Sequence, residues 1–99
     1  MNNFRTLNLA IAFYQNCKDL KMPKRHLQDQ FDRALLSIVL NLSEGNAKPT
    51  ARDRRKFFHI SLGSFREVQT LLLITGYKIQ LQDSDSLGGH LYKLCKNTM

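Results

Sequence analysis

Positively charged side chains gather in one short stretch near the middle of the chain. Five of the nine residues from 48 to 56 are lysine or arginine, and Asp53 is the one acid among them. The five cations are Lys48, Arg52, Arg54, Arg55 and Lys56. Such side chains neutralise phosphates and release counterions, so the cluster predicts salt-sensitive, sequence-independent binding to RNA or DNA.

Helical spacing extends this cluster along the chain. On a helical wheel Arg52, Arg55, His59 and Arg66 fall within about one quarter of the circumference, away from the apolar positions. A solvated helix face that pairs with acids of a neighbouring subunit is the alternative interpretation. The predicted nucleic-acid-binding residues are Lys48, Arg52, Arg54, Arg55, Lys56, His59 and Arg66.

The residues that catalysis would require lack the necessary spacing. His26, His59 and His90 fall on three different predicted helices without an HxxxH, HExxH or ExxH pattern. There is no nucleophile elbow, P-loop or dinucleotide glycine fingerprint. We therefore expect no catalytic residue, no metal and no cofactor. Phe57 and Phe58 are expected to pack in the core, and stacking on bases is the alternative if they are exposed.

Composition bounds the class of protein. Ninety-nine residues make one domain, 1–99, and 42% hydrophobic and 23% charged residues are ordinary for a globular chain. The formal net charge of +7 favours a polyanionic partner. No apolar run has the roughly 18 residues that a membrane span needs, and the polar opening MNNFRT is unlike a signal peptide. We expect a cytoplasmic protein without membrane contact.

The two cysteines carry little functional signal. Cys17 and Cys95 lie far apart and outside any CxxC or Cys/His ligand pattern. Two reduced thiols packed in or near the core are expected. A disulfide between the first and last helices is the alternative.

Two long amphipathic runs form the centre of the chain. One helical face of the first run carries Leu27, Phe31, Ala34, Leu35, Ile38 and Leu42. Gly45 is predicted to end this helix, and Thr50 to cap the next one with Asp53 three residues on. The apolar face of the second run carries Phe57, Phe58, Phe65, Val68, Leu71 and Leu72. Ser61 and Ser64 near the centre of that face predict a close helix contact.

The chain ends are predicted to supply two further helices. The first spans Phe4 to Lys21, and Pro23 ends it. Residues 77–81 finish the third helix or link it to a short fourth one, which begins between Ser84 and Ser86 and ends near Lys96. Its face carries Leu87, Leu91, Leu94 and Cys95. The fold class is therefore all-α, an antiparallel up-down four-helix bundle with a short fourth helix.

Besides its core face, a predicted helix can carry a second row of apolar residues, and such second stripes lie away from the predicted core in this chain. They predict self-association, because one stripe per helix suffices for a monomeric bundle. A wider bundle core is the alternative. The predicted oligomer interface comprises Leu9, Phe13, Leu36, Leu40, Leu62 and Leu73.

Three polar residues near the helix seam are expected to be structural. Glu44 lies in the last turn of its helix, where the dipole disfavours an anion, so a cation from Arg52, Arg54 or Arg55 is expected beside it. Asn41 in the same turn can hydrogen-bond nearby carbonyls. Glu67 is interpreted as an interhelical or intersubunit ion-pair partner.

Two motifs connect these residues to a known family. The first is Asn41-Leu42-Ser43-Glu44-Gly45, and the second comprises Lys56, Phe57, Phe58, Ile60, Ser61, Gly63, Ser64 and Glu67. The pair resembles the bacterial four-helix bundle family encoded in intervening sequences of 23S rRNA genes. That family is related to the accessory proteins of diversity-generating retroelements, which bind nucleic acid and a reverse transcriptase. The resemblance implies a homopentamer, with Asn41, Glu44, Gly45, Gly63, Ser64 and Glu67 as a structural motif.

Two functional hypotheses follow. The first is a non-catalytic homo-oligomer, a pentamer by resemblance, that binds RNA or other nucleic acid through a basic surface at the turn before the third helix and on that helix. The second is a protein-interaction scaffold that recruits a nucleic-acid-processing enzyme without contacting RNA itself.

Overall fold

The computed structural model describes residues 4–98, which form five helices and no strand. The helices are α1 (Phe4–Cys17), α2 (Arg25–Ala47), α3 (Ala51–Thr75), α4 (Lys78–Asp83) and α5 (Asp85–Asn97). The predicted all-α class is confirmed, and the long helices begin where the apolar periodicity places them. The first helix ends at Cys17, four residues before the predicted end.

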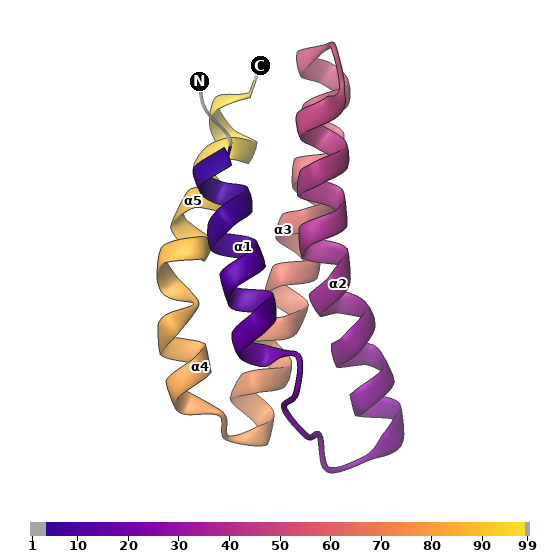
Figure 1. Ribbon diagram of the computed structural model, residues 1–99, viewed down its shortest axis with the longest axis vertical. Helices are drawn as coiled ribbons and strands as arrows, with labels where there is room; N and C mark the ends of the chain where they lie inside the picture. Colours follow the sequence, from indigo (N-terminus) through magenta and orange to yellow (C-terminus); the bar gives the residue numbers. More distant parts are fainter. Residues whose placement is uncertain (1–3, 99) are drawn as a thin grey trace.

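The five helices form four arms that lie side by side. One of these arms consists of α4 followed by α5 (Figure 1). Each arm packs on two neighbours: α2 contacts α1 and α3, and α5 contacts α3 and α1. Both chain ends lie at the end of the molecule that holds the α2–α3 turn, while the α1–α2 loop and the α3–α4 turn lie at the other (Figure 1). With 23 and 25 residues, α2 and α3 are the longest helices, and their turn projects past the start of α1 and the end of α5 (Figure 1).

Local signals explain most of the helix ends. Thr50 caps α3, because its Oγ1 accepts a hydrogen bond of 3.2 Å from the backbone N–H of Asp53, as predicted. Gly76 ends α3 in the left-handed conformation, with φ of 83°. The short helix α4 was not predicted. It has only six residues, of which Leu81 alone packs against the core, so it is too short for a helical period to mark it in the sequence.

The end opposite the α2–α3 turn is held by side-chain bonds to loop carbonyls and amides. Gln28 Oε1 accepts from the backbone N–H of Met22 at 2.8 Å, and Gln28 Nε2 donates to the carbonyl of Leu20 at 3.2 Å. The Tyr77 hydroxyl donates to the carbonyl of Lys21 at 2.6 Å. These bonds join the α1–α2 loop to α2 and to the start of the fourth arm.

The core is continuous along the four arms. The predicted core residues Phe31, Leu35, Ile38, Phe58 and Leu72 are all buried. The predicted face of the last helix is buried as well, with Leu87, Leu91, Leu94 and Cys95. Leu27 and Phe57 are only partly buried.

Two of the predicted interface residues belong to this core instead. Phe13 and Leu62 are each only 6% exposed. The Phe13 ring meets the Phe65 ring edge-on, with centroids 5.9 Å apart. Their prediction as surface residues is wrong, because the helical wheel does not show how far around each helix the neighbouring arms reach.

Gly45 does not end α2, which corrects its prediction as a helix terminator. The helix continues to Ala47, and Gly45 is buried within it. A Cβ atom on Gly45 would lie 2.7 Å from Cε1 of the Phe58 ring. Glycine is therefore required here so that the Phe58 ring can lie against the α2 backbone.

Small and polar side chains also take part in the α2–α3 contact. The Ser61 hydroxyl donates to the carbonyl of Ile38 at 2.8 Å, and the Ser37 and Ser64 hydroxyls are 2.8 Å apart. This confirms the close helix contact predicted from Ser61 and Ser64.

Substituting the two α2–α3 glycines should have opposite effects on stability. Gly45→Ala places a methyl group inside contact distance of Phe58, so we expect a loss of about 1–2 kcal/mol in the free energy of unfolding. Gly63→Ala is the matched control, because nothing lies within 4 Å of its Cβ position. It should stabilise α3 by about 0.5–1 kcal/mol. Urea unfolding of both variants measures this, and a Gly45→Ala variant as stable as the parent contradicts the required glycine.

Candidate nucleic-acid interface

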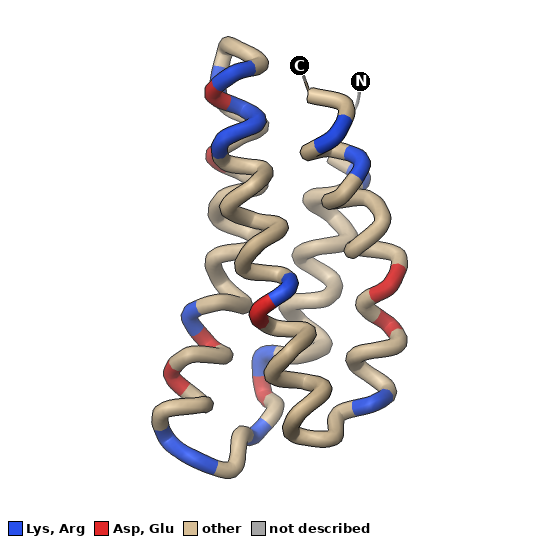
Figure 2. Tube along the Cα trace, turned by 180° about the vertical axis from the view of Figure 1, so that it is seen from behind, with Lys and Arg blue, Asp and Glu red and all other residues tan. Residues whose placement is uncertain are grey.

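Positive charge is concentrated at the end of the molecule that carries the α2–α3 turn and both termini (Figure 2). We call this region the basic end. It holds eight of the fifteen Lys and Arg residues but only two of the eight acids, an excess of six in a formal net charge of +7. The cations are Arg5, Lys48, Arg52, Arg54, Arg55, Lys56, Lys93 and Lys96, and the acids are Glu44 and Asp53.

Two of the predicted phosphate-binding residues hold the α2–α3 turn in shape. Arg54 Nη1 donates to the carbonyls of Lys48 and Pro49, at 3.2 and 3.1 Å, and so caps the end of α2. Lys48 Nζ lies 3.0 Å from Glu44 Oε2 and 5.1 Å from the centroid of the Phe57 ring. Lys48, and not Arg52, Arg54 or Arg55, is thus the cation beside Glu44, because the i, i+4 spacing brings the two side chains together.

The other five predicted residues are available to a ligand. Arg52, Lys56, His59 and Arg66 are exposed, and Arg55 is partly buried. Within the described part of the chain, Lys48–Glu44 is the only ion pair, so none of these five is neutralised by an acid at contact distance. The five residues form a row that begins at the basic end and follows α3 toward its middle.

Three cations of the basic end were not predicted from the sequence as binding residues. Arg5 lies in the first turns of α1, and Lys93 and Lys96 lie in the last turns of α5. Arg5 is the single charge of its segment, and Lys93 and Lys96 are only a pair of charges in theirs, so neither segment stands out as a dense basic cluster. The folded arrangement of the arms brings these residues to the same end as the α2–α3 turn (Figure 1).

Three members of the predicted structural motif, Gly45, Ser64 and Glu67, take part in the α2–α3 contact. Asn41 Nδ2 donates to the carbonyl and the hydroxyl of Ser37, at 2.9 and 3.0 Å, and Gln30 Nε2 donates to Glu67 Oε2 across the two helices. Glu67 is therefore held between the helices by a hydrogen bond from the neutral amide of Gln30, and the interhelical ion pair predicted for it does not form within the described residues. Gly63 is exposed and makes no close approach within the chain.

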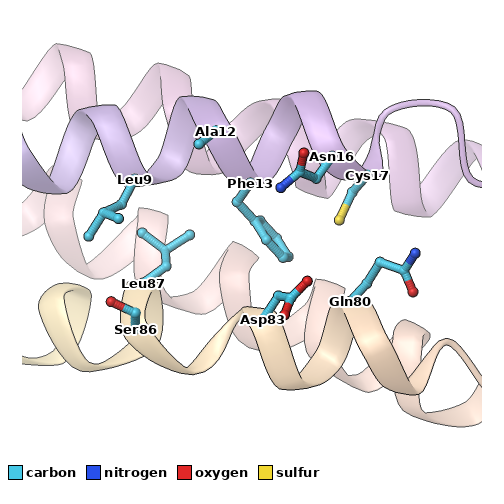
Figure 3. A pocket seen from close by; sticks show the side chains of 9 residues that line it. All are labelled: Leu9, Ala12, Phe13, Asn16, Cys17, Gln80, Asp83, Ser86 and Leu87. Atoms are coloured by element: carbon cyan, nitrogen blue, oxygen red, sulfur yellow. The ribbon is translucent and has the colours of Figure 1, made fainter.

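A pocket of about 450 Å³ lies between α1 and the α4–α5 arm, away from the row of cations (Figure 3). The Phe13 ring and the Cys17 thiol enter it from α1, and Asp83 and Gln80 face them from α4 (Figure 3). Burial, and secondly the charge of Asp83, raise the pKa of Cys17 to about 11. The thiol is therefore protonated near neutral pH, and a protonated thiol is a poor nucleophile.

The other side chains that could take part in catalysis or metal binding do not gather at one site in the described residues. Both cysteines are buried and unbonded to each other, as expected, and burial also raises the pKa of Cys95. In residues 4–98 no group of three or more His, Cys, Asp or Glu side chains gathers to hold a metal ion. Over the same range, none of the helices is long and apolar enough to cross a membrane.

The buried thiol predicts how stability depends on pH. Because folding raises the pKa of Cys17 from 9.0 to about 11, the folded state binds this proton more tightly than the unfolded state does. The contribution is fully present below pH 9 and is lost as the pH rises toward 11, roughly 2 to 3 kcal/mol in all. Urea unfolding from pH 8 to 11 measures the loss, which should be smaller in Cys17→Ala. An equal loss in both proteins contradicts the assignment to Cys17.

Comparison with known proteins agrees with the motifs. The family model described as 23S rRNA-intervening sequence protein matches residues 4–98. Comparisons with curated proteins and with solved structures gave no match. The match runs through all the helices, including the Asn41–Gly45 and Lys56–Glu67 segments that carry the resemblance. The chain therefore belongs to the family of 23S rRNA-intervening sequence proteins.

Proposed function

We propose that this protein is a non-catalytic, cytoplasmic homo-oligomer that binds RNA through its basic end and the adjoining row of cations on α3. Each copy is an antiparallel up-down four-helix bundle, and five copies assemble, as the family resemblance implies. The observation that carries the proposal is the excess of six positive charges at one end of the chain.

The chemistry of this end suits a phosphate backbone. Arg52 and Arg55 lie one turn apart, have no acidic partner in the described residues, and sit beside a turn held rigid by Arg54. Guanidinium groups offer several donors in a fixed fork, which matches the geometry of phosphate oxygens. A pre-formed cluster of this kind binds a polyanion mainly by releasing counterions, which gives affinity without base specificity.

Charge reversal of Arg52 and Arg55 should weaken RNA binding. Two lost phosphate contacts should lower the slope of log affinity against log salt by about 1.4 to 1.8. Arg54 is left unchanged because it caps α2. Binding of a labelled structured RNA across a salt series measures both affinity and slope.

The matched control moves the same charge change to the opposite end. Lys24→Glu with Arg25→Glu also reverses two exposed cations, and these lie at the start of α2. The proposal expects nearly unchanged affinity in this variant. Equal weakening in both double variants points to net charge alone, and affinity that is insensitive to salt contradicts phosphate binding.

Exposed apolar side chains support the oligomer. Leu36 and Leu40 lie one turn apart on α2 and are 44% and 56% exposed, and Leu73 on α3 is 65% exposed. Leu9, the remaining predicted interface residue, is partly buried against the core. Covering exposed leucines gains roughly 25 cal/mol per Å² of apolar surface, which favours burial against another protein surface.

Charged substitutions on α2 should dissociate this oligomer. Leu36→Glu with Leu40→Glu introduces two charges into the proposed interface, while the buried core is untouched. Light scattering should show the parent as an oligomer and the variant as a monomer with an unchanged circular dichroism spectrum. Ile79→Glu is the control, because Ile79 is also exposed but lies on α4. A monomeric parent contradicts self-association.

The same leucines support one other candidate function. A scaffold that recruits a nucleic-acid-processing enzyme would use this apolar face of α2 to bind that enzyme. The two functions differ in one measurement, because a scaffold of this kind binds no RNA at low salt. Absence of RNA binding by the parent protein therefore favours the scaffold.

A further inference from the structure

A second hollow, of about 480 Å³, lies between α3 and α5. We call it the α3–α5 groove. Its walls are Leu62, Phe65, Arg66 and Gln69 of α3 and Asp85, Gly88, Gly89 and Tyr92 of α5. Arg66 belongs both to this groove and to the row of cations on α3. The groove therefore lies where a polyanion held by that row would reach α5.

The two glycines of the groove serve different purposes. A Cβ atom on Gly88 would lie 2.9 Å from Cε2 of Phe65, so α5 packs directly on this ring. Nothing lies within 4 Å of the Cβ position of Gly89, which is exposed. Packing within the chain explains Gly88 and leaves Gly89 unexplained, although glycine destabilises a helix relative to alanine. Because Gly89 has no side chain, it leaves the α5 wall of the groove open.

The side chains at the groove suit a nucleobase better than a phosphate. Tyr92 is 53% exposed, which leaves an aromatic ring accessible for stacking. The Asp85 carboxylate repels a phosphate but accepts hydrogen bonds from the N–H groups of a base edge. Arg66 can meet the phosphate next to a base that lies in the groove.

The basic end leads directly to this groove. Arg55 and Arg66 are eleven residues apart, which is about 16 Å along α3. On α5, Lys96 follows Tyr92 by four residues and so shares its face, on the side toward the basic end. Cations of the basic end thus lie on both helices that form the groove.

We propose that the α3–α5 groove holds an unpaired base of single-stranded RNA, stacked on Tyr92, while Arg66 contacts the adjoining phosphate. This inference rests on the proposed function, because the basic end must first hold the strand. A paired base is stacked within its helix and cannot enter the groove. The protein should therefore bind single strands more tightly than a duplex at the same salt concentration.

Removing the ring of Tyr92 tests the groove separately from the basic end. Loss of one stacked base should lower affinity for a labelled oligouridine strand by roughly tenfold in Tyr92→Ala. The salt slope should stay the same, because no charge is lost. Tyr92→Phe keeps the ring and should bind within about twofold of the parent, since stacking needs only the aromatic face. A blunt RNA duplex should bind the parent and both variants alike, and fluorescence anisotropy measures all of these affinities.

A second variant tests the open wall of the groove. Gly89→Leu should fill the groove without changing charge or contacting the core, and it should weaken binding of the single strand but not of the duplex. Equal affinity of the parent for strand and duplex, or unchanged strand binding in Tyr92→Ala, overturns the groove proposal and leaves the proposed function standing. A parent protein that binds neither RNA overturns both.

Discussion

The close packing of α2 on α3 is the contact on which the candidate interface depends. Near the α2–α3 turn the Phe58 ring lies against the α2 backbone at Gly45. Farther from the turn, the Ser61 hydroxyl donates to the carbonyl of Ile38. Because α2 and α3 are much longer than α1, with 23 and 25 residues against 14, their turn projects beyond it. The shape of the basic end therefore follows mainly from this one helix pair.

The cations at the projecting turn fall into two groups, those that bond within the chain and those without an acidic partner in the described residues. Arg54 bonds to the last carbonyls around α2, and Lys48 is paired with Glu44. These two cations fix the turn that presents Arg52 and Arg55 without acidic partners. A basic cluster of this kind differs from a flexible charged tail, because a rigid backbone already sets the spacing of its free cations. Ordering such side chains on a ligand then costs less conformational entropy.

Helix types, most of the core and the central part of the site were predictable from the sequence, because each depends on residues close together in the chain. Periodicity identified Phe31, Ile38 and Phe58 as core residues, and Thr50 marked the start of α3. Features that depend on how the arms meet were not predictable in this way. The helical wheel could not show that Phe13 and Leu62 are covered by neighbouring arms, or that Lys93 and Lys96 join the α2–α3 turn.

Gly45 shows the same limit in a single residue. Glycine is common both after helix ends and where two helices touch, and only the partner helix distinguishes the two roles. Here Phe58, thirteen positions later in the chain, makes the difference. The α3–α5 groove was not predictable for a similar reason, since its two walls come from segments about twenty residues apart in the sequence.

The elongated shape of the molecule determines which of its charges act together on a distant ligand. Its longest dimension is 41 Å, whereas electrostatic fields in 0.1 M salt decay over about 10 Å. The two ends are therefore screened from one another. The opposite end carries a smaller excess than the basic end, with Lys18, Lys21, Lys24, Arg25 and Lys78 against Asp19. At such salt concentrations a single chain behaves as a rod whose more strongly charged pole is the basic end. An approaching polyanion should turn this rod so that the pole faces it before any contact forms.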